Sequence, residues 1–179
     1  RNRMLEVLSL LFKETDIEEI DKLIYLCQGR VAPAYVKLEF GVGESLAAEA
    51  LSKASGQPKT EMLRLYKEKG DFGEVAGAVL PPQTTKLTVI ELFDHLYRLA
   101  VASGEGAVTA KTDLLADLLA SSSPRDGRLL VRISLGRLRL GIGDPTMMDG
   151  LSFARQGDKS LRPTLERAYN ICSDLGYVA

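Results

Sequence analysis

The chain has 179 residues and a formal net charge of −1, and 45% of its residues are hydrophobic. This length fits one domain, or two small halves that share a core, and the composition is sufficient for a hydrophobic core. No apolar run approaches the roughly 18 residues of a transmembrane helix, and the N-terminus lacks the small-residue cleavage site of a signal peptide.

The chemistry-bearing residues are few and scattered. Cys27 and Cys172 are the only cysteines, and both lie in apolar helical patterns, which is not a disulfide framework. His95 is the only histidine and also lies in a helical apolar pattern, which favours a structural role over that of a general base. No Cys/His cluster has metal spacing, and no pair of carboxylates suits acid–base work. We therefore expect an intracellular protein (the cytoplasm of a prokaryote, or the nucleus) with no catalytic residue and no metal site.

Apolar residues recur at helical spacing along almost the whole chain. The first two helices are expected at 4–13 and 16–28, with Asp16 as N-cap of the second and Glu19 completing a capping pair. Glycine and proline separate the remaining helices. These are expected at 45–55, 58–69, 72–80, 88–103, 111–121, 125–135, 145–156 and 161–173, with short extended pieces at 35–40 and 137–140. The pattern predicts an all-α fold, a compact array of about ten to twelve helices.

An internal repeat organises these helices. Residues 7–30 align with 114–137, residues 38–44 with 138–144, and residues 66–76 with 169–179. Three ordered matches with small changes of offset indicate a duplication. We expect two pseudo-symmetric lobes, about 4–80 and 88–179, within a single domain over 1–179. The second copy ends just after its motif, which suggests a fragment of something longer.

Each copy carries a Gly-Arg pair followed by Gly-x-Gly and an acid. The pairs are Gly29-Arg30 and Gly136-Arg137, and the second motifs are Gly41-Val42-Gly43-Glu44 and Gly141-Ile142-Gly143-Asp144. The first glycine suits a left-handed exit from a helix, and the acid suits the N-cap or first turn of the next helix. Glycine amides at a helix N-terminus are able to bind a phosphate, although the same glycines could make only tight helix corners.

The second copy is the richer candidate for binding. Arg137 and Arg139 alternate with leucines, so an extended backbone would place both arginines outward. Residues 125–139 hold five arginines and one acid. Such a stripe can bind phosphates or a minor groove on a neutral protein, or it can be an ordinary solvated face. The first copy has Arg30 and Lys37 nearby but Glu39 where Arg139 stands, so this copy is expected to contribute less to binding.

A third candidate is a loop that includes Gly106. This loop leads into the helix expected at 111–121. Thr109 is expected to cap that helix and Lys111 to lie in its first turn. A cation there opposes the helix dipole, so an anion bound nearby would explain it. The alternative is an ordinary exposed lysine.

The ordered set of motifs resembles the N-terminal DNA-binding domain of ATP-dependent DNA ligases, most closely the archaeal replicative type. The matching stretches are residues 24–33, 38–44, 70–76, 103–106, 135–144 and 168–176. The resemblance implies two pseudo-symmetric helical halves on the minor-groove side of nicked duplex DNA, with phosphate and sugar contacts that lack sequence preference, in replication, repair and recombination. The expected DNA-binding residues are Gly136, Arg137, Arg139, Gly141, Gly143, Thr109, Lys111, Gly106 and Arg30.

One departure from the family concerns catalysis. The family's nucleotidyl-transfer lysine lies in Lys-x-Asp-Gly, but Pro124 and Met147 stand two residues before the aspartates of the two Asp-Gly pairs. We therefore expect no lysine of this chain to take AMP, and we expect the adenylation and OB-fold domains to be absent from this chain. We expect the parent protein to seal nicks with ATP and magnesium, and this chain to need no cofactor and to be inactive alone. Its expected partners are nicked double-stranded DNA and the catalytic domains of the same protein, not a membrane.

Two other functions compete with DNA binding. A helical protein-interaction scaffold would show a large exposed apolar patch, whereas DNA binding predicts a basic face over 104–111 and 136–143. An autonomous enzyme is disfavoured because the sequence contains no catalytic constellation.

Overall fold

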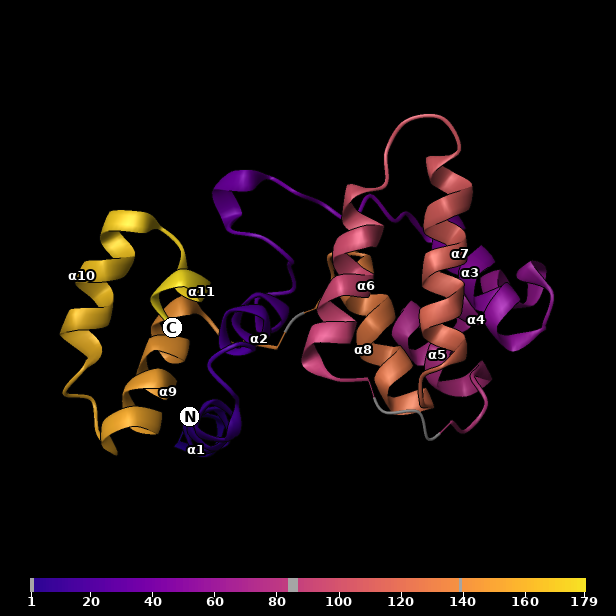
Figure 1. Cartoon of the computed structure of the whole chain (residues 1–179). Coiled ribbons are helices and arrows are strands. Elements are labelled where there is room, and N and C mark those ends of the chain that lie inside the picture. The colour runs from indigo at the N-terminus through magenta and orange to yellow at the C-terminus, as the bar shows by residue number, and fades with distance from the viewer. Residues whose placement is uncertain (1, 84–86, 139) are drawn as a thin grey trace. The chain divides into compact units, whose positions relative to one another are not determined.

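The computed structural model describes residues 2–83, 87–138 and 140–179. In these residues eleven α-helices and one 3-10 helix account for all regular structure, and none is a strand, so the all-α prediction is confirmed (Figure 1). No helix in the described ranges has the length and apolar character needed to cross a membrane. The elements are α1 (Asn2–Glu14), α2 (Ile20–Cys27), η1 (Ala34–Val36), α3 (Glu44–Ser55), α4 (Lys59–Lys69), α5 (Phe72–Val79), α6 (Val89–Val101), α7 (Ala107–Ala120), α8 (Pro124–Ser134), α9 (Asp144–Gln156), α10 (Arg162–Cys172) and α11 (Leu175–Val178).

Several helix ends follow from local sequence, and others do not. Ser123 caps α8 by accepting the amide of Asp126 at 3.1 Å, with Pro124 in the first turn. The expected cap at Asp16 is wrong, because α2 begins at Ile20. The Asp16 backbone carbonyl instead accepts the amides of Glu19 and Ile20, in the turn that leads into the helix. The extended piece expected at 35–40 is instead partly the 3-10 helix η1.

The start of α7 also differs from the prediction. Thr109 is not the N-cap; the helix begins at Ala107, and Gly106 is the N-cap with a φ of +78°. Glycine adopts this left-handed conformation without steric cost, so the chain enters the helix earlier than the side-chain capping rule predicts. Lys111 consequently lies in the second turn of α7, not the first.

The helices form two compact units. Unit 1 comprises Arg1–Leu38 with Arg139–Ala179, and unit 2 comprises Glu39–Leu138. Unit 1 thus holds α1, α2, η1 and α9 to α11, and unit 2 holds α3 to α8. These units are not the two lobes, 4–80 and 88–179, that the sequence repeat predicts. The duplication itself stays a prediction.

In unit 1, α1 packs along α9 and α2 packs on α11. Leu8 and Phe12 of α1 are buried, and a Cβ at Gly150 of α9 would lie 3.0 Å from the Phe12 ring. The Tyr25 hydroxyl of α2 donates to Asp174 Oδ1 at 2.8 Å, and Asp174 also caps α11. Gly150 thus lets α1 approach α9 closely, and a buried hydrogen bond joins α2 to the residue that caps α11.

In unit 2, α3 packs on α7 and α5 packs on α8, while α4 and α6 cover these pairs. The core side chains below 2% exposure include Leu51, Met62, Phe72, Leu99 and Leu115. Burying each stabilises the fold by about 1.5–3 kcal/mol relative to exposure. This core supports the start of α7 and the end of α8, where five of the nine predicted binding residues lie.

Candidate nucleic-acid interface

The end of α8 forms the first corner of the candidate interface. Gly136 has a φ of +66°, and the amide of Arg137 donates to the Arg132 carbonyl at 2.7 Å. This is a glycine-terminated helix end, in which the left-handed residue lets the chain turn away from the helix axis. The predicted helix exit at Gly136 is confirmed, and the turn places Arg137 as the first side chain beyond it.

Arg137 contacts two residues of unit 2. Its Nη2 donates to Glu44 Oε1 at 2.9 Å, and its Nη1 lies 3.4 Å from the Tyr66 hydroxyl. The Tyr66 hydroxyl in turn donates to Glu44 Oε1 at 2.6 Å. These hydrogen bonds, from Tyr66 first and then Arg137, hold the pKa of Glu44 below its ordinary value. The Arg137 side chain is 50% exposed, so part of the guanidinium faces solvent.

The loop before α3 forms the second part of the site. Gly41 has a φ of +63°, while Gly43 is the N-cap of α3 with an extended backbone. The Lys111 ammonium donates to the Phe40 carbonyl, and Lys111 is only 9% exposed. Its charge therefore lies against this loop and not in open solvent, and a direct phosphate contact by Lys111 stays a prediction.

A groove of about 560 Å³ runs between this loop and the start of α7. It is lined by Gly41, Gly43, Ser45, Leu46, Glu49, Lys53, Lys59, Val108, Thr109 and Thr112. The structure thus brings the predicted residue Thr109 beside two glycines of the first sequence copy. Sequence reasoning left Gly41 and Gly43 out of the binding set, although they carry the same motif as Gly141 and Gly143.

Unit 1 contains a related corner. Gly29 has a φ of +73°, and the amide of Arg30 donates to the Tyr25 carbonyl at 3.0 Å. Asp144, the first residue of α9, accepts the Gln28 side-chain amide at 2.8 Å and the Tyr169 hydroxyl at 2.6 Å.

The predicted residues divide between the two units. Gly141, Gly143 and Arg30 belong to unit 1, while Gly136, Arg137, Gly106, Thr109 and Lys111 belong to unit 2. The remaining predicted residue, Arg139, lies outside the described residues.

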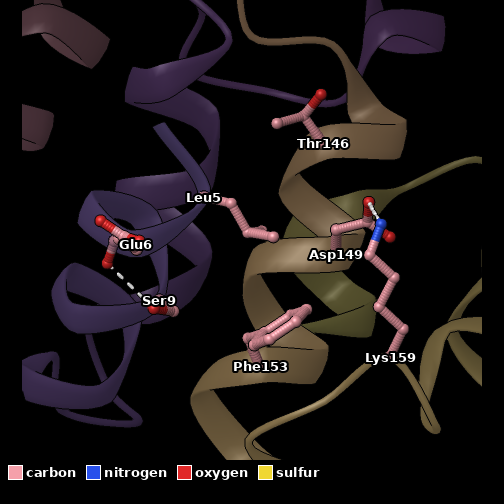
Figure 2. A pocket seen from close by; sticks show the side chains of 7 residues that line it. All are labelled: Leu5, Glu6, Ser9, Thr146, Asp149, Phe153 and Lys159. Atoms are coloured by element: carbon pink, nitrogen blue, oxygen red, sulfur yellow. Dashed lines mark hydrogen bonds and ion pairs between the residues drawn. The ribbon is translucent and has the colours of Figure 1, made fainter. Parts of the chain in front are cut away.

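A separate cavity of about 360 Å³ lies between α1 and α9 in unit 1 (Figure 2). Figure 2 shows Leu5, Glu6 and Ser9 on one wall, Thr146, Asp149 and Phe153 on the other, and Lys159 reaching Asp149 from a loop. Lys159 and Arg162 donate to Asp149 at 2.7 and 2.6 Å. Burial acts to raise the pKa of Asp149, but these hydrogen bonds outweigh burial and hold the pKa below its ordinary value. Asp149 is thus held as an ion-paired carboxylate between two cations.

Comparison with known proteins identifies the family. The family model for the DNA ligase N terminus matches residues 1–152. The chain is 54% identical over its whole length to a probable DNA ligase of Dictyoglomus thermophilum, covering 31% of that protein. It is 43% identical to DNA ligase 2 of Thermofilum pendens and 41% identical to a DNA ligase of Staphylothermus marinus, covering 32% and 33% of them. The chain therefore spans about a third of the length of these relatives, and it belongs to the DNA ligase N-terminus family.

Proposed function

We propose that this chain is the DNA-binding part of an ATP-dependent DNA ligase that acts in replication, repair and recombination. It holds nicked double-stranded DNA along the minor groove, through phosphate and sugar contacts that lack sequence preference. ATP and magnesium serve the catalytic domains of the parent protein, and this chain alone is inactive.

One observation carries the proposal: Gly43 is not required by the fold. Its φ is −94°, a conformation that any residue adopts, and a Cβ there would meet no atom within 4 Å. An N-cap with Asp, Asn or Ser would stabilise α3 better than a bare turn, since such side chains accept an orphan amide. A close approach of another molecule to the helix N-terminus explains the missing side chain, and a phosphate suits the exposed amides.

The neighbouring groups fit the same ligand. A guanidinium has five N–H donors in a planar arrangement that suits a phosphate, and the side chain of Arg137 is 50% exposed. Gly106 at the start of α7 also has open space where a side chain would stand. Phosphate and sugar contacts of this kind fix a protein on the duplex without reading its sequence.

We also propose that the two sequence copies arose by duplication. Within unit 1, α1 packs on α9; within unit 2, α7, which aligns with α1, packs on α3, which aligns with α9. The pairs α2 with α11 and α8 with α5 correspond in the same way. These equivalent pairings support the duplication and suggest that each unit joins one half of each copy.

Fluorescence-anisotropy titration of nicked and intact duplexes at several salt concentrations tests the proposed function. We expect binding that is independent of sequence and weakens steeply with salt, because phosphate contacts release counterions. Tighter binding to the nicked duplex would assign nick sensing to this domain. Absence of binding even at low salt would contradict the proposal.

Replacement of Gly43 with asparagine is expected to weaken DNA binding about tenfold while leaving the free energy of unfolding equal or slightly higher. Asparagine is a favoured N-cap, but its side chain would fill the space that the phosphate needs. The matched control is Gly56→Asn at the other end of α3, where the left-handed conformation tolerates asparagine and the Cβ meets open space. Equal DNA affinities of wild type and Gly43→Asn would remove this helix N-terminus from the interface.

A second candidate function, a protein-interaction scaffold, is favoured by α1. Met4, Val7, Leu10 and Leu11 are 39%, 55%, 59% and 38% exposed on this helix. Exposed apolar residues in one helix favour contact with another protein. The titration separates the two functions, since a scaffold has no salt-dependent affinity for DNA.

A further inference from the structure

Arg137 of the proposed interface already has an anionic partner. Glu44 Oε1 accepts both Arg137 Nη2 at 2.9 Å and the Tyr66 hydroxyl at 2.6 Å. Tyr66 is itself held by its ring, which stacks on Phe72 at a centroid distance of 4.0 Å. The carboxylate is therefore fixed in place by a buried support and presents its charge to Arg137.

The related corner of unit 1 shows that this ion pair is not needed to build the turn. There Asp144 accepts a neutral amide, that of Gln28, together with the Tyr169 hydroxyl. Among the described residues, no ion pair joins Arg30 to Asp144. The hydrogen bond to Asp144 raises the pKa of Tyr169, and the nearby charge of Arg30 opposes that rise only in part. The acid at the helix N-terminus is satisfied in both corners, but only in unit 2 is its partner a cation.

Stability does not account for the pair either. The side chains of Arg137 and Glu44 are 50% and 43% exposed, and exposed ion pairs contribute little to the free energy of unfolding. A carboxylate beside an arginine does, however, cancel much of the field that would attract a second anion. The pair thus has its main effect on what Arg137 binds.

We infer that Glu44 is a resident anion that a DNA phosphate must displace from Arg137. This inference rests on the proposed function. DNA binding then exchanges one anion for another at the guanidinium, which lowers the affinity for the duplex. The exchange also speeds dissociation of the DNA, because the Glu44 carboxylate is held by Tyr66 and binds the guanidinium again as the phosphate leaves. Glu44 is in this sense a positioning residue that acts on DNA through Arg137.

The substitution Glu44→Gln tests the inference, because glutamine keeps an oxygen acceptor for Tyr66 and removes the charge. We expect the chain carrying it to bind duplex DNA about fivefold more tightly, with slower dissociation, in stopped-flow and anisotropy measurements. The control Glu68→Gln removes the same charge from α4, where Glu68 pairs with Arg64 at 3.2 Å. It is expected to give a much smaller gain. In an Arg137→Ala background the gain from Glu44→Gln should fall to the level of this control.

Two failures are distinguishable. In the first, Arg137→Ala weakens DNA binding, but Glu44→Gln either tightens binding no more than Glu68→Gln does or weakens binding. This result overturns the resident-anion inference and leaves the proposed function standing. If neither Arg137→Ala nor Glu44→Gln changes the affinity, Arg137 does not bind DNA, and both the inference and this part of the proposed interface are overturned. A full-size gain from Glu44→Gln in the Arg137→Ala background would also overturn the inference, since the charge would then act without Arg137.

Discussion

Replacement of Arg137 with alanine is expected to weaken binding of duplex DNA about tenfold at moderate salt, equally for all sequences. Charge-assisted hydrogen bonds to a phosphate contribute about 1.5–3 kcal/mol, and part of this is offset here by the loss of the Glu44 ion pair. The log–log slope of affinity against salt should fall in magnitude by about 0.9 for each phosphate contact removed. Replacing Arg137 and Arg139 together should lower the magnitude of this salt slope about twice as much. Anisotropy titrations at four or more salt concentrations measure both quantities.

The control for this prediction is Arg64→Ala, which removes an arginine that is 59% exposed and paired with Glu61 and Glu68 on α4. It should change the slope and the affinity far less. Urea denaturation should give nearly unchanged stability for both variants, since each ion pair is exposed. An Arg137→Ala chain with wild-type affinity and salt slope would exclude Arg137 from the interface.

Replacement of Phe72 with alanine is expected to lower the free energy of unfolding by about 3–5 kcal/mol. Phe72 is 1% exposed, and it begins α5, which packs on α8. The substitution removes a whole ring from the core and leaves a cavity that its neighbours fill only in part. Such a loss is a large fraction of the roughly 5–15 kcal/mol that stabilises a domain. Urea denaturation followed by circular dichroism measures it.

A less severe variant separates packing from the support of Tyr66. Phe72→Leu keeps most of the apolar volume and should cost much less than Phe72→Ala, but it removes the ring that stacks on Tyr66. If the stack fixes the Tyr66 hydroxyl, Phe72→Leu should loosen the contact with Glu44 and shift the DNA affinity in the direction of Glu44→Gln. A loss below about 1 kcal/mol in Phe72→Ala would contradict the core position of this residue.

The helical fold and many of its boundaries could be predicted because their causes are local. Apolar spacing specifies helices, and Ser123 with Pro124 specifies the start of α8. Gly29 and Gly136 mark helix exits for the same reason. The start of α7 was missed because two local signals compete there. Thr109 suits a side-chain cap, but the left-handed conformation of Gly106 starts the helix earlier.

The site could be predicted only in part, because its contacts join distant residues. Lys111 bonds the carbonyl of Phe40, 71 residues away, and Arg137 bonds Glu44, 93 residues away. Helical periodicity says which face of a helix is apolar, but not which helix covers it. The sequence therefore predicted the glycine corners and singled out Arg137 as a candidate, but it did not predict that Glu44 and Tyr66 contact its guanidinium.

The two units also differ in how the chain assembles them. Unit 2 is one continuous stretch, whereas unit 1 joins its first segment to a second that is made only after the whole of unit 2. Synthesis proceeds from the N-terminus, so α1 and α2 emerge long before α9 and α11, the helices that cover them. Contacts between such distant segments form slowly, because a long loop must close first. Unit 2 is thus free to fold during translation, while the apolar faces of α1 and α2 stay uncovered until α9 and α11 have left the ribosome.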